Sequence, residues 1–315
     1  MSVQKRKVTV IGTGFVGASI AYTIAARHLA YEIVLIDINS EKAIGEATDI
    51  SHALPIFGSM DIIAGEYKDV KDSDIIIITA GVNRRPGETR LDLAGKNVAI
   101  TKSIINEVMK HYNKGIFVVV SNPVDVLTTM IKKWTGLPAE KVIGSGTTLD
   151  TIRFKQSLYS LFNVDVNDLN AVVIGEHGET QFPFWSQANI AGTPITQIKT
   201  VFGHKLTEDD MQDISETVKT SGAQIIKNKG ATYFGVASAV SDIVDSILNN
   251  KNAVLTVGMN KDEIFGFKDV SLSVPRVIGA SGIVRDLEII LTPEEEEKLK
   301  KSAENIYQIT KEFIK

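Results

Sequence analysis

The sequence predicts an α/β protein that begins with a doubly wound parallel sheet and continues into a C-terminal α+β domain. Four short runs in the first half are almost entirely apolar, as strands are when both faces of a sheet are covered. These runs are 7–12, 32–37, 74–81 and 116–122. Amphipathic helical stretches separate the runs, and repeated strand–helix–strand units are typical of parallel sheets. The clearest helical stretches are 17–30 and 95–112.

The pattern changes after about residue 150. Periodicity predicts helices over 150–162, 207–228 and 232–249, and strands over 252–259 and 269–277. A charged helix is expected to begin at Pro293. We therefore predict two domains, 1–149 and 150–315. Because no low-complexity linker separates them, we expect them to share an interface.

Composition and charge argue against several classes of protein. With 315 residues, 43% of them hydrophobic, the chain is long enough for a large core. A formal net charge of −4 gives no basic footprint for nucleic acid. Cysteine is absent, so neither disulfides nor thiolate metal sites are expected. No apolar run reaches the roughly 18 residues of a membrane helix. We expect a cytoplasmic protein without a membrane partner.

A glycine-rich turn follows the first predicted strand. Gly12, Gly14 and Gly17 form a G-x-G-x-x-G motif that opens a helix. In dinucleotide-binding turns these glycines permit a tight turn, close approach of the pyrophosphate, and close helix–strand packing. Asp37 ends the second strand, where a carboxylate binds a ribose 2′-hydroxyl and repels a 2′-phosphate. The sequence predicts a Rossmann-type site for NAD rather than NADP. The alternative is an ordinary glycine turn and a capping aspartate.

Several polar residues stand where a catalytic site could form. His177 follows the apolar run "AVVIG" and is one of only five histidines. Asp150 and Arg153 are three residues apart at a predicted helix start, so they share one face. Asn122 lies at the C-terminal end of a strand, where open α/β sheets bind ligands. The alternatives are a structural histidine for His177 and helix capping for Asp150 and Asn122.

The motifs together carry a resemblance. In order along the chain they are "GTGFVG", "LIDIN", "TAG", "PGETRLDL", "SNPVD", "GSGTTLDTIRF", "GEHGE" and "NKGATYFG". Through them the whole chain resembles the L-lactate/malate dehydrogenase family, and it looks closest to bacterial lactate-type members. The resemblance implies an NAD-dependent enzyme that transfers hydride between NADH and a small 2-keto acid, and a homodimer or homotetramer. A non-catalytic NAD-binding protein, the rival class, would need none of the residues His177, Asp150, Arg153 and Arg90.

The resemblance implies a role for each of these four side chains. His177 would be the acid and base, giving a proton to the ketone oxygen as hydride reaches the carbon. Asp150 would hold the imidazole and stabilise its charged form. Arg153 would bind the substrate carboxylate through two hydrogen bonds. Arg90, on a loop over 82–93, would polarise the carbonyl when that loop closes.

Further positions match the family's substrate and cofactor contacts. Asn122 and Thr232 would contact the substrate, and Asn122 would also reach the nicotinamide region. The expected cofactor-binding positions are Gly12, Gly14, Phe15, Val16, Gly17, Asp37, Tyr67, Gly81, Asn97, Val120, Asn122 and Ser145.

One arginine decides which substrate the sequence favours. Arg84 stands where lactate-type members usually carry glutamine and malate-type members carry arginine. With Arg153 on the first carboxylate and Arg90 on the carbonyl, Arg84 would bind a second carboxylate. We therefore predict oxaloacetate and L-malate as substrates, and hence a malate dehydrogenase. The alternative is an L-lactate dehydrogenase acting on pyruvate and L-lactate, with Arg84 turned to solvent.

Three more positions depart from the lactate-type pattern. Glu179 replaces the usual aspartate after the glycine that follows His177. Lys155 and Asn170 stand where many bacterial members bind fructose 1,6-bisphosphate between subunits through an arginine and a histidine. Lysine can still hold a phosphate, but asparagine supplies no charge. We therefore predict that this activator acts weakly or not at all.

Overall fold

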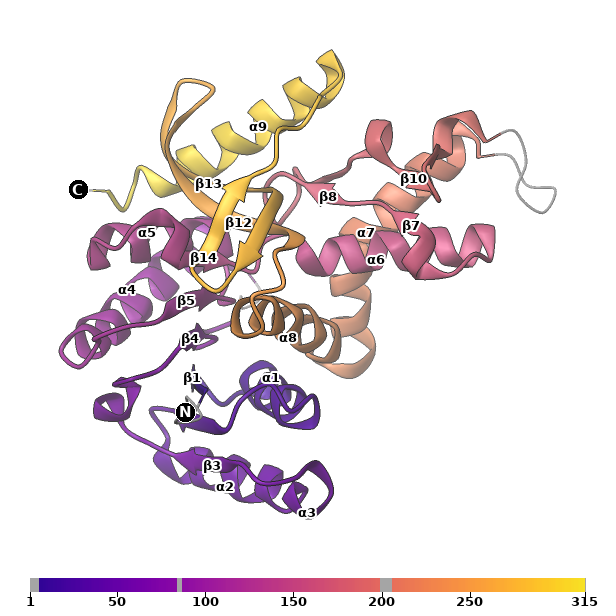
Figure 1. The fold of residues 1–315 in the computed structure, drawn as a ribbon. Helices are drawn as coiled ribbons and strands as arrows, with labels where there is room; N and C mark the ends of the chain where they lie inside the picture. The colour runs from indigo at the N-terminus through magenta and orange to yellow at the C-terminus, as the bar shows by residue number, and fades with distance from the viewer. Residues whose placement is uncertain (1–5, 84–86, 199–205, 315) are drawn as a thin grey trace.

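The computed structural model describes residues 6–83, 87–198 and 206–314, and its centre is a nine-stranded sheet within those ranges. The strands follow the order β14-β13-β12-β6-β5-β4-β1-β2-β3 (Figure 1). Six of them run parallel: β1 (Lys7–Ile11), β2 (Glu32–Ile36), β3 (Asp61–Ala64), β4 (Ile75–Ile78), β5 (Ile116–Val119) and β6 (Val142–Gly144). Strand order reverses between β1 and β4, and ligands of such sheets bind at that switch point.

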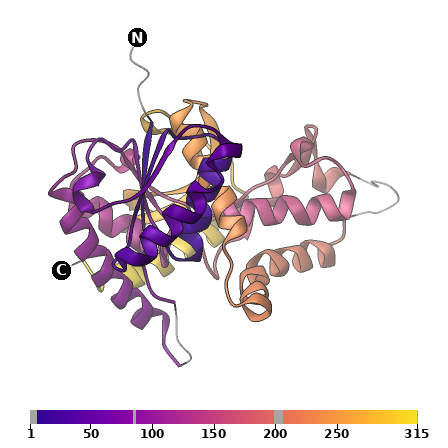
Figure 2. The same cartoon turned by 90° about the horizontal axis from the view of Figure 1, so that it is seen from below.

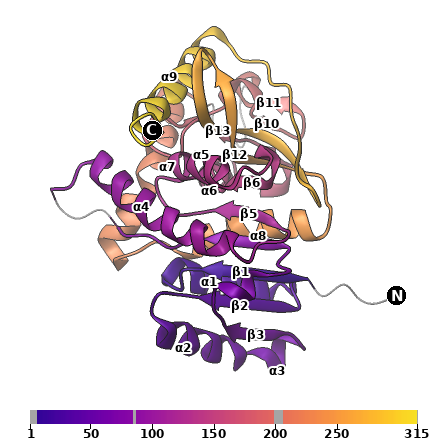
Figure 3. The same cartoon turned by 90° about the vertical axis from the view of Figure 1, so that its left-hand side faces the viewer.

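Three antiparallel strands extend this sheet. They are β12 (Ala253–Ile264), β13 (Phe267–Gly279) and β14 (Gly282–Asp286). β12 joins the parallel strands at β6, through a pairing of Gly258 with Gly144. Figure 3 shows β12 and β13 at one end of the stack and β2 and β3 at the other. One sheet therefore crosses the predicted domain division, which itself falls inside α6 (Thr148–Phe162).

Helices cover both faces of the parallel strands. One apolar core joins the sheet to α1 (Phe15–Ala26), α2 (Ser40–Ser51) and α8 (Phe234–Leu248). A second core joins the other face to α4 (Arg90–Met109) and α5 (Val124–Thr135). α8 comes from the C-terminal half of the chain and packs on α1, where Arg27 forms a 2.7 Å ion pair with Asp245. The two halves thus share a core.

The remaining C-terminal elements stand beside the sheet. α6 packs on α7 (Glu208–Lys229), and Figure 2 shows this pair, in pink and orange, extending away from the sheet. Short strands connect them: β7 (Leu169–Asn170), β8 (Val173–Ile174), β9 (Phe182–Pro183), β10 (Asn189–Ile190) and β11 (Thr193–Pro194). The last helix, α9 (Pro293–Thr310), packs on β13. No helix in the described ranges is long and apolar enough to cross a bilayer.

The predicted fold class is confirmed, and the differences have local causes. The four apolar runs form β1, β2, β4 and β5, and Thr-x-x-Asp/Glu capping boxes start α4, α7 and α9. The strands β3 and β6 were not predicted. β3 lies at the edge of the sheet with Asp61 and Ile63 exposed, so it lacks the apolar run of a covered strand, and β6 has only three residues. The short helix α3 (Leu54–Phe57) follows α2.

Candidate active site

The glycine turn after β1 is built for close approach of a ligand. Gly12 has φ +101°, and a Cβ there would lie 2.6 Å from the Ala80 nitrogen. A Cβ on Gly17 would lie 1.8 Å from the Gly12 oxygen, so any side chain would separate α1 from β1. A Cβ on Gly14 would meet no described atom within 4 Å, which leaves the turn open to the outside. The described residues provide no side-chain cap for α1, so its N-terminal N–H groups can receive phosphate.

Asp37 is held as an anion at the end of β2. Its Oδ2 accepts the backbone N–H of Thr13 at 2.6 Å, and its Oδ1 accepts that of Asn39 at 3.0 Å. Partial burial favours the neutral acid, but these hydrogen bonds prevail and lower the pKa of Asp37. An ionised carboxylate beside an open glycine turn fits the ribose and pyrophosphate of NAD.

A cavity of about 490 Å³ opens at the C-terminal ends of the parallel strands. Both halves of the chain line it, and eleven of the predicted site residues are among its lining. They are Val16, Gly81, Arg90, Asn97, Val120, Asn122, Ser145, Asp150, Arg153, His177 and Thr232.

Six other predicted cofactor residues lie outside the lining of this cavity: Gly12, Gly14, Phe15, Gly17, Asp37 and Tyr67. Phe15 is 70% exposed and stacks on Tyr233. Tyr67 is partly buried against the second core. Asn97 is buried and holds two loops together, because its amide bonds Val82 and the Asn122 carbonyl.

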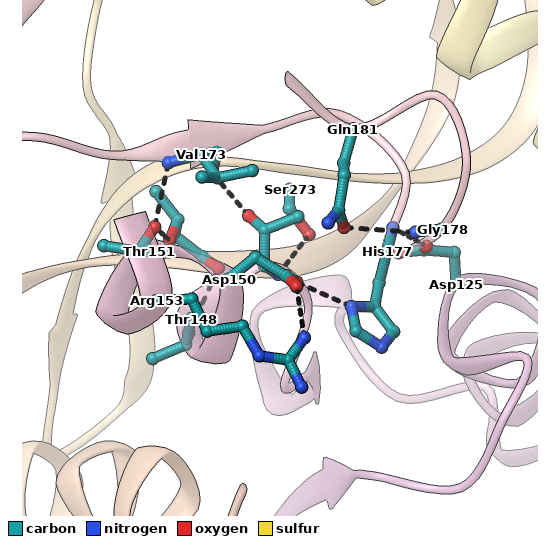
Figure 4. A network of polar contacts seen from close by, with 12 residues as sticks. Asp125, Thr148, Asp150, Thr151, Arg153, Val173, His177, Gly178, Gln181 and Ser273 are labelled. Carbon is teal, nitrogen blue, oxygen red and sulfur yellow. Dashed lines mark hydrogen bonds and ion pairs between the residues drawn. The ribbon is translucent and has the colours of Figure 1, made fainter. Parts of the chain in front are cut away.

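The centre of the cavity holds a three-residue polar contact. His177 Nδ1 lies 2.7 Å from Asp150 Oδ2, and Arg153 Nη1 donates to Asp150 Oδ1 at 3.0 Å (Figure 4). Asp150 and Arg153 come from the first turns of α6, three residues apart as the sequence indicated. His177 comes from the loop between β8 and β9, so two distant segments meet at one carboxylate.

Burial and charge set the protonation of this group. Burial of Asp150 favours its neutral form, but His177 and Arg153 prevail and hold the pKa of the carboxyl below its usual value. Burial likewise disfavours the imidazolium, yet contact with Asp150 raises the pKa of His177. The pair therefore favours a charged imidazole next to a carboxylate. Such a histidine can give a proton to a bound ligand near neutral pH.

The loop predicted over 82–93 is described only in part. Arg84, to which a second carboxylate contact was assigned, lies outside the described residues. Arg90 is the first residue of α4 and lines the cavity. Its guanidinium forms an ion pair with Glu179, which sequence reasoning had noted only as a departure from a pattern.

Sequence reasoning missed other residues around the cavity. Lys219, Gly222 and Ile226 of α7 line it, yet they lie in a helix whose sequence carries no motif. Gln181 lies beside His177 and contributes a hydrogen bond to Asp150. Asp125 accepts the backbone N–H of His177 at 2.8 Å. Only Asp125 had a sequence signal, because it lies in the motif "SNPVD".

Fold and site together define a dehydrogenase with an NAD-binding glycine turn and a histidine–carboxylate pair beside an arginine. Residues 6–144 match the lactate/malate dehydrogenase NAD binding domain, and residues 147–315 match the alpha/beta C-terminal domain of the same family. The chain belongs to the lactate/malate dehydrogenase family. It is an NAD-dependent L-2-hydroxy acid dehydrogenase.

Curated and solved relatives cover nearly the whole chain. The L-lactate dehydrogenase of Acetivibrio thermocellus is 46% identical over 97% of this chain and 96% of its own. That of Thermoanaerobacterium saccharolyticum is 44% identical over 98% and 99%. The ligand-bound minor L-lactate dehydrogenase of Enterococcus mundtii superposes with a TM-score of 0.94, with 38% identity and 99% of each chain covered.

These relatives overturn the predicted substrate. They are L-lactate dehydrogenases, so the prediction of oxaloacetate and L-malate, and of a malate dehydrogenase, is wrong. The prediction depended on one positive charge, that of Arg84. A loop arginine can be solvated by water, so its presence in a sequence does not put it against a substrate. Identity along the whole chain carries more weight than one loop position.

Proposed function

We propose that this protein is an L-lactate dehydrogenase, which reduces pyruvate to L-lactate with NADH and catalyses the reverse reaction. The names of its relatives support this substrate. The observation that carries the chemistry is the 2.7 Å contact of His177 Nδ1 with Asp150 Oδ2 inside the cavity. It supplies a charged acid beside a carboxylate-binding arginine.

Each of three residues has a defined task in this proposal. Bound NADH supplies hydride to the carbonyl carbon. Because Nδ1 of His177 is occupied by Asp150, its Nε2 is the nitrogen that gives a proton to the ketone oxygen. Asp150 fixes the ring and stabilises the imidazolium before the proton leaves. Arg153 donates one hydrogen bond to Asp150 through Nη1, and its other guanidinium N–H groups bind the carboxylate of pyruvate.

Arg90 completes the polar side of the pocket. It lines the same cavity as His177, where a guanidinium can stabilise negative charge that develops on the ketone oxygen. To do so it has to exchange its ion pair with Glu179 for the substrate. Asn122 and Thr232 also line the cavity and are proposed to contact the substrate.

We also propose that the chain works as a homo-oligomer, as its resemblance implied. Large apolar side chains stand exposed on neighbouring helices of the N-terminal half: Ile56 is 86% exposed and Tyr22 50%. Tyr22 of α1 contacts Phe57 of α3, the residue after Ile56, so the two helices adjoin here. Light scattering on the purified chain tests this. A monomer at micromolar concentration would reject the proposal.

Steady-state kinetics test the substrate. With saturating NADH, kcat/KM is measured for pyruvate and for oxaloacetate, and the product of pyruvate is assayed with a stereospecific lactate test. We expect pyruvate to be preferred and the product to be L-lactate. A preference for oxaloacetate would return the assignment to the malate branch. No turnover of either keto acid would favour a non-catalytic NAD-binding protein.

A further inference from the structure

Asp125 is a buried carboxyl group directly behind the catalytic histidine. It lies in the first turn of α5, and only 3% of the residue is exposed. Its Oδ2 accepts the backbone N–H of His177 at 2.8 Å, as Figure 4 shows. Its Oδ1 is buried and has no hydrogen-bond partner in the described part of the chain. Asp125 is not among the residues that line the cavity, yet it holds the backbone of His177, which does line it.

The charges facing Asp125 come from three elements. Glu176 and His177 lie in the loop after β8, and Asp150 lies in α6. Arg276 of β13 also faces it. Its Nε is bound to Asp286 at 2.8 Å, and its Nη1 donates to two backbone carbonyls. Asp125 thus faces the carboxyl groups of Glu176 and Asp150 and the imidazole of His177. Arg276 is also nearby, but its hydrogen bonds within the described residues go to Asp286 and to backbone carbonyls.

These surroundings make Asp125 titrate near neutrality. Burial is the largest effect and raises the pKa of Asp125. The hydrogen bond from the backbone N–H of His177 lowers the pKa, and the negative charge of Glu176 raises it. The resulting pKa is about 7. A buried oxygen without a donor also favours the neutral acid, because an anion there lacks solvation. Asp125 is therefore neutral in mildly acidic solution and becomes charged as the pH rises.

We propose that Asp125 is a positioning residue for His177: its carboxyl oxygen anchors the backbone of that histidine, and its negative charge, once formed, stabilises the imidazolium. The proposal rests on the proposed function, in which His177 supplies the proton. It gives a role to the charge of Asp125, since the oxygen of an amide would anchor the backbone equally well.

The sign of the effect follows from the charges. Keto acid reduction requires the imidazolium, and an ionised Asp125 raises the pKa of His177. Ionisation of Asp125 therefore keeps His177 protonated to a higher pH than Asp150 alone would. Reduction then persists further into the alkaline range. Oxidation of the hydroxy acid, which needs neutral imidazole, begins at a correspondingly higher pH.

The test compares two substitutions. Asp125→Asn keeps an oxygen for the His177 N–H and loses the charge, whereas Asp125→Ala loses both. For Asp125→Asn we expect kcat/KM for pyruvate near pH 6 to stay close to wild type. The pH at which kcat/KM declines on the alkaline side should be lower than in wild type by about one unit, the order of effect that one nearby charge has on a pKa. Asp125→Ala should show the same shift and also a lower plateau. Asp61 is an exposed carboxylate on β3, so Asp61→Asn is the charge control. It should change neither the plateau of kcat/KM nor the pH of its alkaline limb.

A second measurement needs neither substrate nor cofactor. The pKa of the His177 ring is followed by NMR, its signal being identified by its loss in His177→Asn. We expect a lower pKa in Asp125→Asn than in wild type. An unchanged His177 pKa and an unchanged alkaline limb would overturn the proposal. If wild type turned over no keto acid, the proposed function would fail instead, and the NMR titration would still decide the role of Asp125.

Discussion

Arg90 and Glu179 form an ion pair across the mouth of the cavity. Arg90 begins α4, and Glu179 lies two residues after His177. The pair therefore links the start of α4 to the loop that carries His177, the proposed proton donor. Both side chains are well exposed, at 41% and 71%. Water and salt screen such a pair, so it is easily exchanged for another partner.

Substituting Glu179 should improve substrate binding modestly. In Glu179→Gln, Arg90 no longer has to leave a carboxylate to reach the keto acid. Exposed ion pairs contribute about 0.2–1 kcal/mol, so we expect KM for pyruvate to fall by at most about fivefold. Glu216→Gln, another glutamate near this rim, controls for loss of a negative charge. A rise in KM for Glu179→Gln would mean that Glu179 guides Arg90 to the substrate.

Substituting His177, the proposed proton donor, should remove most of the rate. His177→Asn should lower kcat by about 10²–10⁴-fold, the usual contribution of general acid–base catalysis. The dissociation constant of NADH, measured by fluorescence, should stay nearly unchanged. His111→Asn, an exposed histidine, is the matched control. Full activity in His177→Asn would remove this residue from the mechanism.

Removing the partner of His177 should shift the pH profile. Asp150 raises the pKa of His177, so Asp150→Asn should lower it. Because reduction needs the imidazolium, the alkaline limb of kcat/KM for pyruvate should move down by about 1–3 pH units. KM should also rise, since Arg153 loses its carboxylate partner. An alkaline limb that stays in place would show that Asp150 does not set the charge of His177.

Cofactor choice should follow Asp37. Its lowered pKa keeps it ionised near neutral pH, and an anion there repels a 2′-phosphate. We expect a higher kcat/KM with NADH than with NADPH, and a smaller ratio in Asp37→Ala. Glu41→Gln removes an exposed charge in the next helix and should leave the ratio as it is. Equal use of both cofactors by wild type would contradict the role of Asp37.

Fructose 1,6-bisphosphate should activate weakly or not at all. Burial lowers the pKa of Lys155, Asp242 opposes that effect, and the Asn170 amide is bonded to Asn189. Lys155 and Asn170 together therefore do not supply the two strong cationic contacts that a bisphosphate requires. KM for pyruvate is measured with and without the activator at constant ionic strength. A large fall in KM on addition would reject this inference.

The sequence alone indicated the elements whose residues are close along the chain. The glycines at 12, 14 and 17 and the helix after them form one continuous turn, so their spacing predicts the cradle. Asp150 and Arg153 share a helix face because they are three residues apart. Capping boxes predict helix starts for the same reason, since both partners lie within one turn.

The tertiary structure decided what depends on distant segments. Motif spacing does not show that His177 meets Asp150, that Asp125 holds the His177 backbone, or that β12 joins β6. Such contacts depend on the free energy of packing whole elements together, which no local pattern contains. The wrong substrate was corrected by the relatives and not by the structure, because Arg84 lies outside the described residues. Its charge is evident from the sequence, but a local pattern does not show what that charge contacts.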